Sequence, residues 1–329
     1  MAFRRGINPF SKINNDTGFG TNASSYGGRF INRDGTYNLR KTGMSFLERF
    51  SIYNFMLNLP RWKFIGVILI FFFGINSLYT SIYLLFGSEQ FTGMISVSGW
   101  AKIKELFFFS TETFTTVGYG RVNPVGDGAN FVAAIEAMSG FLSFAIATGL
   151  IYGRFSKPKA YLAFSDYAVV APYKRISGLM FRFAPYKDGH ALTNVEIKVS
   201  IGLKVQENGE TNYRYYDLDL ERTRVDSLMM NWTVVHPIDE KSPLLGLSED
   251  DMKTADVELY ILIRGFDDTF SNIVLSRTSY TYEEIRFNRK FVPMYKESED
   301  GKTTILELHK LNESIEIKLI NEESRQQIS

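Results

Sequence analysis

The sequence contains no cysteine and only three histidines, and each shortage excludes a class of chemistry. Without cysteine the chain can form no disulfide, no thiolate metal site and no thiol nucleophile. The histidines, His190, His236 and His309, are scattered along the sequence, which does not indicate a metal site. The sequence also lacks a Walker loop, a nucleophile elbow and paired catalytic carboxylates, so we expect neither an enzyme nor a bound cofactor.

An excess of one charge is lacking too, because 37 basic residues balance 36 acidic ones and the formal net charge is +1. We therefore expect no nucleic-acid partner. The average composition conceals two long apolar stretches, because a large polar region dilutes them.

The two apolar stretches are long enough to be transmembrane helices. The first, about residues 63–86, contains roughly 23 consecutive residues without a charge, enough to cross a hydrocarbon core of about 30 Å. The second, about residues 129–155, is interrupted only by Glu136 before Arg154. The sequence therefore predicts an integral membrane protein with two spans.

Basic residues flank both predicted spans and set their orientation. Arg61 and Lys63 precede the first span, and Arg154, Lys157 and Lys159 follow the second. Positive charge is retained on the cytoplasmic side, so we expect both termini in the cytoplasm. The absence of cysteine favours a bacterial inner membrane over a eukaryotic plasma membrane.

Five residues between the spans, Thr116, Val117, Gly118, Tyr119 and Gly120, are typical of a potassium selectivity filter. Stacked rings of backbone carbonyls can replace the hydration shell of a potassium ion. Successive carbonyls point inward only if the backbone alternates between right- and left-handed conformations, which the two glycines tolerate. We expect potassium to bind at residues 116–119, with the threonine hydroxyl at the inner end and the valine and tyrosine packing outward.

The stretch before the filter, about residues 100–113, is rich in aromatic residues and too short to cross a bilayer. It fits a re-entrant pore helix that ends at the filter, where its negative dipole end favours a cation. Glu136 in the second span is costly in lipid and must face protein or water. We expect it to form a structural hydrogen bond near the pore helix.

The chain before the first span has two parts. Residues 1–43 are rich in Gly, Asn, Ser and Arg, which predicts a mobile segment, with a short docking strand indicated by the Asp-Gly turn within 28–39. Residues 44–60 space apolar side chains at helical intervals up to Pro60, which predicts an amphipathic helix at the inner membrane surface. The alternative is an ordinary amphipathic helix packed on a soluble domain.

The period changes after the second span, and residues 159–329 show β patterns. Apolar residues alternate with polar ones from Asn194 to Val205, which predicts a strand with one wet face. Several shorter β-rich runs separated by turn residues favour an antiparallel sandwich over βαβ units. No GxGxxG motif follows any of these runs, so we expect no Rossmann-type nucleotide domain.

These features together resemble the inward rectifier potassium channels, most of all the prokaryotic members. The resemblance is carried by six segments in order along the chain: 29–35, 60–63, 111–113, 157–159, 179–182 and 235–244. It implies a membrane α-helical two-span tetrameric pore with a cytoplasmic all-β immunoglobulin-like sandwich domain that extends the pore. It also implies a homotetramer that is gated by anionic lipids.

The resemblance implies two constrictions and a lipid site. Tyr152 matches the constriction where the inner helices cross, with Phe144 one register higher, and Gly265 and Phe266 match a second constriction in a loop of the sandwich. Tyr152 would also suit a plain interfacial tyrosine. Arg61, Lys63, Arg154, Lys157 and Lys159 would bind lipid headgroups, although the positive-inside rule alone would explain these charges.

The sequence departs from the family pattern at several positions. Strong rectifiers carry acids where this chain has Phe144, about Asn194 and Arg264, so we expect only weak block by internal magnesium or polyamines. The family often pairs the glutamate before the filter with an arginine two residues after it. Here the glutamate is Glu112 and the arginine is Arg121, one residue early, so we expect Glu112 to bond backbone or hydroxyl groups behind the filter.

Two alternatives remain open at this point. One is a two-span potassium channel gated by a soluble ligand in its cytoplasmic domain. The other is a membrane-tethered β-sandwich that binds a partner and does not conduct, which leaves the filter residues unexplained.

Overall fold

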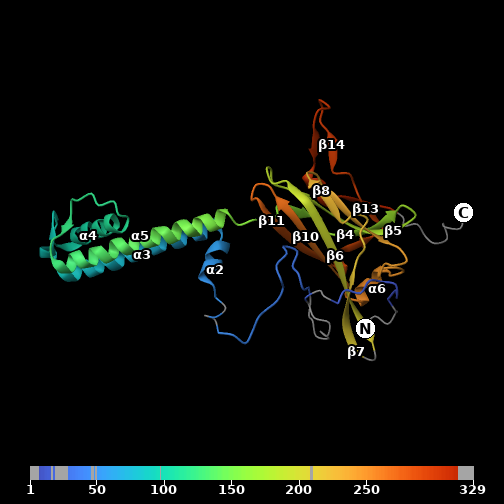
Figure 1. Cartoon of the computed structure of the whole chain (residues 1–329), viewed down its shortest axis with the longest axis horizontal. Helices are drawn as coiled ribbons and strands as arrows, with labels where there is room; N and C mark the ends of the chain where they lie inside the picture. Colours follow the sequence, from blue (N-terminus) through green and yellow to red (C-terminus); the bar gives the residue numbers. More distant parts are fainter. Residues whose placement is uncertain are drawn as a thin grey trace. The chain divides into compact units, whose positions relative to one another are not determined.

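The chain divides into two units, which are described separately. The computed structural model describes residues 7–15, 18, 29–45, 48, 50–96, 98–207 and 210–317. One unit comprises residues 41–157, and the other comprises residues 1–40 together with 158–329 (Figure 1). Parts of the predicted mobile segment and of the predicted interfacial helix, including Phe46, lie outside the described residues.

Three long helices, with a short one described below, make up most of the described part of the pore unit, the name we use for residues 41–157. They are α3 (Arg61–Phe86), α4 (Gly99–Phe114) and α5 (Asp127–Phe155), and α3 and α5 are apolar and long enough to cross a membrane. Helices α3 and α5 run side by side in Figure 1, and α4 lies next to one end of this pair. Helix α3 begins after Pro60 and ends at Gly87, whose φ of 84° favours glycine.

Aromatic rings fasten α4 to α3. Tyr83 of α3 contacts Phe109 of α4 edge-to-face, with 5.2 Å between ring centroids, and both rings contact Phe91. Phe91 belongs to β1 (Phe91–Thr92), which pairs with β2 (Asn123–Pro124) beside the short helix η1 (Ser88–Gln90). The α4 helix is therefore packed within its own subunit before any partner is added.

A short helix, α2 (Ile52–Asn58), precedes the first span. It is shorter than the predicted range of 44–60. Ser51 caps its N-terminus, and it stops at Asn58 because Pro60 pushes the residue before it into extended backbone. Helix α2 packs against the end of α5, where Arg154 donates to the Met56 carbonyl at 3.3 Å.

The β unit, comprising residues 1–40 and 158–329, is built on two five-stranded sheets. The first sheet contains β6 (Leu192–Glu207), β7 (Glu210–Asp217), β8 (Arg224–Leu228), β10 (Glu258–Asp267) and β11 (Asn272–Thr281). The second contains β3 (Leu162–Phe164), β4 (Ala168–Tyr173), β5 (Ile176–Pro185), β9 (Trp232–Ile238) and β12 (Ile285–Phe287). The predicted all-β sandwich is confirmed, although β4 and β12 pair in parallel rather than antiparallel.

The core lies between the two sheets. The alternating residues of β6 predicted to face inward, such as Val199 and Ile201, are buried there together with Phe181 and Phe183 of β5. The alternation of side chains across a strand directs one face of each sheet into this core.

The remaining short elements of the β unit lie outside its two five-stranded sheets. They are α6 (Glu249–Thr254), η2 (Tyr282–Glu284), β13 (Arg289–Phe291), β14 (Tyr295–Glu297), β15 (Thr304–Leu306), η3 (Leu308–Asn312) and β16 (Ser314–Glu316). Arg182 of β5 is buried and donates to carbonyls in and next to the last of these elements, those of Val292, Lys310, Leu311 and Glu313. Burial lowers the pKa of Arg182 to about 10, so it remains charged at neutral pH.

Two pieces of the predicted mobile segment contact the sandwich. Residues 12–14 lie along β7, where Asn14 donates its backbone N–H to the Tyr215 carbonyl and Asp217 donates to the Lys12 carbonyl. The predicted Asp-Gly turn forms at 34–35, and an isolated bridge joins Ile31 to Tyr37 in place of a full strand. The described part of this segment is thus more extensively bonded than its composition predicts, because distant strands supply its partners.

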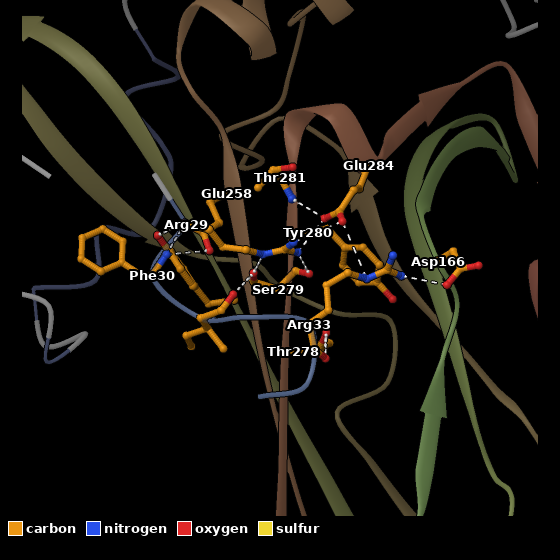
Figure 2. Close-up of polar contacts among 12 residues, drawn as sticks. Arg29, Phe30, Arg33, Asp166, Glu258, Thr278, Ser279, Tyr280, Thr281 and Glu284 are labelled. Carbon is orange, nitrogen blue, oxygen red and sulfur yellow. Dashed lines mark hydrogen bonds and ion pairs between the residues drawn. The ribbon is translucent and has the colours of Figure 1, made fainter. Parts of the chain in front are cut away.

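Two arginines fasten the second piece to the sandwich. Figure 2 shows Arg29 donating to the Ser279 hydroxyl and to Glu284, with 2.6 Å from Nη2 to Oε2 of the glutamate. Arg33 donates to Asp166 at 3.1 Å, and the Phe30 backbone N–H donates to the buried carboxylate of Glu258. We call residues 29–38 with these partners the N-terminal clasp.

Candidate ion-conduction site

The predicted filter residues form an alternating backbone. The φ angles are 58° at Thr116, 56° at Gly118 and 80° at Gly120, whereas Val117 and Tyr119 have negative φ. The left-handed conformations at the two glycines were predicted from the sequence, and the structure extends the alternation to the threonine. Successive carbonyls of such a strand can point to the same side.

The end of α4 holds the start of this strand. Val117 and Gly118 donate their backbone N–H groups to the Glu112 carbonyl, at 2.9 and 3.3 Å. The Val117 and Tyr119 side chains are 54% and 79% exposed, so this subunit alone does not cover them.

Arg121 does not pair with Glu112. It pairs with Glu105, which lies about two turns before Glu112 on α4. Its Nη1 lies 2.9 Å from Oε1 of Glu105, whose other oxygen accepts the backbone N–H groups of Ile95 and Ser96. Glu105 is buried and Arg121 is half exposed. The sequence did not indicate Glu105 as the partner of Arg121, because no motif marks it.

The Glu112 carboxylate makes no hydrogen bond within the described part of this single chain. Only its carbonyl oxygen supports the filter, through the two N–H groups above. That the Glu112 side chain bonds groups behind the filter stays a prediction.

Glu136 forms the predicted structural hydrogen bond to the pore helix. It is fully buried in α5, and the Ser110 hydroxyl of α4 donates to its Oε1 at 2.5 Å. The Tyr83 hydroxyl of α3 donates to the other carboxylate oxygen, also at 2.5 Å. The sequence indicated neither hydroxyl as a functional residue.

Beneath the filter, α3, the end of α4 and α5 surround an apolar cavity of about 390 Å³. Thr116 and Phe144 both line it, which brings the inner end of the filter and the predicted cavity residue together. Tyr152 lies two turns further along α5 and does not line this cavity, but it is 73% exposed.

The predicted second constriction lies within a strand rather than a loop. Gly265 and Phe266 belong to β10, where the pairing with β6 is irregular between Arg264 and Phe266. An irregularity of this kind bends the strand and changes the direction of side chains. Regular pairing with β11 on the other side keeps these residues in the sheet.

The predicted lipid-binding cations fall into different surroundings. Arg61 and Lys63 are exposed at the start of α3. At the end of α5, Arg154 lies over the Phe64 ring and Lys157 donates to Asn58 at 2.6 Å, so α2 already engages both. Lys159 belongs to the other unit and is exposed near the Tyr161 ring.

Of the three positions compared above with the acids of strong rectifiers, Phe144 lies in α5, Asn194 in β6 and Arg264 in β10. Arg264 is exposed and is directly paired with Glu196 across the two strands. Arg224 of β8 pairs with Glu196 from the other side and also donates to Asn194 at 2.8 Å. Glu196 is therefore flanked by an arginine on each neighbouring strand.

Comparison with known proteins decides the family. A family model described as the inward rectifier potassium channel C-terminal domain matches residues 162–329, and one described as ion channel matches residues 67–157. The inward rectifier potassium channel Kirbac3.1 of Paramagnetospirillum magnetotacticum is 30% identical over 288 residues, which is 87% of this chain and 95% of that protein. The chain belongs to the inward rectifier potassium channel family.

Two mammalian proteins of this family are also similar. The ATP-sensitive inward rectifier potassium channel 12 of Mus musculus and that of Bos taurus are each 30% identical over 224 residues. The match covers 63% of this chain and spans about half of each mammalian protein, 51%. Family membership confirms the two-span channel architecture with a C-terminal β domain, and it identifies a potassium channel in the membrane rather than an enzyme.

Proposed function

We propose that four copies of this chain surround one pore and conduct potassium through residues 116–120. The observation that carries the proposal is the alternation of backbone conformation at Thr116, Gly118 and Gly120, on a loop between two helices long enough to span a membrane. Four such strands facing one axis would provide rings of carbonyl oxygens for dehydrated potassium ions.

Uncovered apolar surface supports assembly. Only 17% of the most apolar window of α3 and 11% of that of α5 is buried within the subunit. Tyr119, Phe144 and Tyr152 are among the exposed aromatic residues. Lipid can cover some of this surface, but a filter strand must pack against protein because its irregular backbone cannot face lipid.

Anionic lipids would gate the channel through the five cations at the ends of the spans. Arg61, Lys63, Arg154, Lys157 and Lys159 are each worth about 1 kcal/mol of attraction to an anionic surface. Since Lys157 bonds to Asn58, a headgroup that binds this lysine competes with its contact to α2. Lipid binding would thereby change how the end of α5 is held.

The constrictions would lie at Phe144 and Tyr152 of α5 and near Gly265 and Phe266 of β10. An aromatic ring in a narrow apolar passage can close it to ions by excluding water. The exposed fractions of Phe144 and Tyr152, 74% and 73%, leave both rings free to face a central axis.

Rectification would be weak. Magnesium and polyamines are attracted by acids along the pore, and at this place Arg264 and Arg224 flank Glu196 on the neighbouring strands. Oppositely charged neighbours across a sheet reduce the attraction that the acid exerts on a cation.

Rubidium uptake into vesicles tests the proposal. We expect rubidium uptake that barium blocks. Potassium should compete with this uptake and sodium should not. The uptake should also change when the anionic lipid content of the vesicles is varied. No uptake in any lipid mixture would favour the non-conducting alternative. Selective uptake that ignores lipid but requires a soluble factor would favour the ligand-gated alternative.

A double variant tests the lipid site. Replacing Lys157 and Lys159 by glutamine should weaken the lipid response by about 30-fold, because each removes about 1 kcal/mol. The matched control replaces the exposed Lys290 and Lys302, which removes the same charge from the sandwich. A changed potassium-over-sodium ratio with an unaltered lipid response would refute the assignment.

A further inference from the structure

Glu136 is an unusual residue for a transmembrane helix. It is fully buried in α5, and in the described part of the chain no lysine, arginine or histidine forms an ion pair with it. Its two carboxylate oxygens accept hydrogen bonds from Ser110 of α4 and Tyr83 of α3. An ionisable group at membrane depth is costly and is kept where it has a function.

Ser110 of α4 lies at the point where α3, α4 and α5 meet. Its hydroxyl oxygen lies 2.5 Å from Glu136 of α5 and 3.1 Å from the Oδ1 atom of Asn76 of α3. Asn76 is fully buried, and its carbonyl also accepts the Thr80 hydroxyl. Ser110 lies six residues before Thr116, on the helix that ends at the filter.

A second contact holds the same two helices one turn along α5. Gly140 lies so close to the Phe114 carbonyl that an added Cβ atom would be 1.9 Å from its oxygen. Phe114 is the last residue of α4. Residues 136 and 140 lie on one face of α5, so this face fixes both the middle and the end of the pore helix.

We propose that Glu136 is a positioning residue for the selectivity filter, acting on it through Ser110 and the pore helix. This inference rests on the proposed role of residues 116–120. Releasing Ser110 would let α4 shift relative to α5, and the carbonyl oxygens at Thr116 and Val117 would shift with the helix end that holds them. Potassium selectivity depends on where those oxygens stand.

Two single substitutions separate positioning from plain stability. Ser110→Ala and Tyr83→Phe each remove one hydroxyl and leave one oxygen of the same buried carboxylate unpaired, so their costs to stability should be similar. Only the first frees the pore helix. We expect Ser110→Ala to lower the potassium-over-sodium permeability ratio by about tenfold and Tyr83→Phe to change it little.

The measurement is the reversal potential of the full-length tetramer in planar bilayers under potassium and sodium gradients. Ser110→Thr keeps the hydroxyl and should restore the ratio. If Ser110→Ala does not assemble, Ser110→Cys keeps the shape with a weaker donor and should give a smaller drop than the alanine was expected to give. Equal ratios in Ser110→Ala and the unaltered chain, or equal losses in Ser110→Ala and Tyr83→Phe, would overturn the inference.

Glu136→Gln tests whether the negative charge of Glu136 is needed for potassium selectivity. The amide oxygen can accept the Tyr83 hydroxyl and the amide N–H can donate to Ser110, so the geometry is preserved. We expect near-normal selectivity from Glu136→Gln and a loss from Glu136→Leu. A loss as large with glutamine as with leucine would show that the charge attracts ions directly, against positioning. An unaltered chain without selectivity would instead defeat the proposed function.

Discussion

The two units of this chain treat their apolar side chains in opposite ways. In the β unit, residues such as Val195 and Ile263 are buried between two sheets of the same chain. In the pore unit, side chains such as Phe73 and Phe141 remain more than half exposed along α3 and α5. The β unit therefore buries its core within one chain, whereas the described residues of the pore unit leave much of the apolar surface of α3 and α5 uncovered.

Their buried polar groups differ as well. The β unit buries the charged guanidinium group of Arg182. The N–H groups of this side chain donate to backbone carbonyls. The pore unit buries Glu136 against hydroxyl groups. The Arg182 side chain thus joins segments of the β unit through backbone carbonyls, whereas the Glu136 carboxylate joins α5 to α3 and α4 through side-chain hydroxyls.

The largest expected effect is in the filter. Gly118→Ala places a side chain at a φ of 56°, which costs a non-glycine residue roughly 1–2 kcal/mol in each of the four copies. Apart from its two chain neighbours, no described residue of the chain has an atom within 4 Å of the added carbon, so the cost comes from the backbone rather than from a clash. We expect barium-sensitive rubidium uptake to be lost while the tetramer and the β unit remain folded.

Circular dichroism and gel filtration provide the control for that variant. Unfolding of the sandwich by Gly118→Ala would contradict the independence of the two units. Selective uptake that survives Gly118→Ala would contradict the proposed filter.

The N-terminal clasp should give an intermediate effect, confined to the β unit. Glu284→Gln weakens the ion pair with Arg29, both of whose side chains are only 19% exposed. Charge-assisted hydrogen bonds contribute about 1.5–3 kcal/mol, so hydrogen exchange of the amides in residues 29–38 should accelerate by roughly 10- to 100-fold. Arg40→Gln, at an exposed position, is the matched control.

Potassium selectivity should be unaffected by Glu284→Gln and by its control, because the proposed filter lies in the other unit. Unchanged exchange in Glu284→Gln would mean that the clasp is held by its apolar residues Phe30 and Ile31 alone.

The smallest expected effect is the pH dependence of the β unit at His236. Its Nδ1–H donates to the Asp219 carbonyl and its Nε2 accepts the Ser242 hydroxyl, an arrangement that requires the neutral ring. Burial lowers the pKa of His236 below the ordinary 6.5. Its contribution to stability is therefore complete above pH 6.5 and is lost as the pH falls through the lowered pKa.

Urea unfolding at pH 8 and pH 5 checks this for the unaltered chain and for His236→Gln. The glutamine variant should lose less stability on acidification, and His309→Gln, at an exposed position, should not differ from the unaltered chain. Burial raises the pKa of Glu258, which acts in the opposite direction, so the difference between chains is the informative quantity. An identical loss of unfolding free energy between pH 8 and pH 5 in all three chains would contradict this role of His236.

The sequence predicts most of what depends on nearby residues. Two long apolar stretches, the second interrupted by Glu136, predicted α3 and α5, alternation predicted β6, and five residues indicated the proposed filter with its left-handed glycines. These patterns are local because hydrogen bonding and burial repeat with the period of the helix or strand. The boundaries of α2 and the parallel pairing of β4 with β12 were not predicted, since distant segments compete for the same backbone groups.

Pairs of distant residues were decided only by the tertiary structure. Arg29 meets Glu284 across 255 positions, and Arg121 meets Glu105 in place of Glu112. A side chain bonds to whatever the fold brings within about 3 Å, and no local pattern records that distance. The sequence by itself therefore determined the family of the protein and the place of its proposed filter, while the packing of helices and sheets determined which distant residues hold each segment.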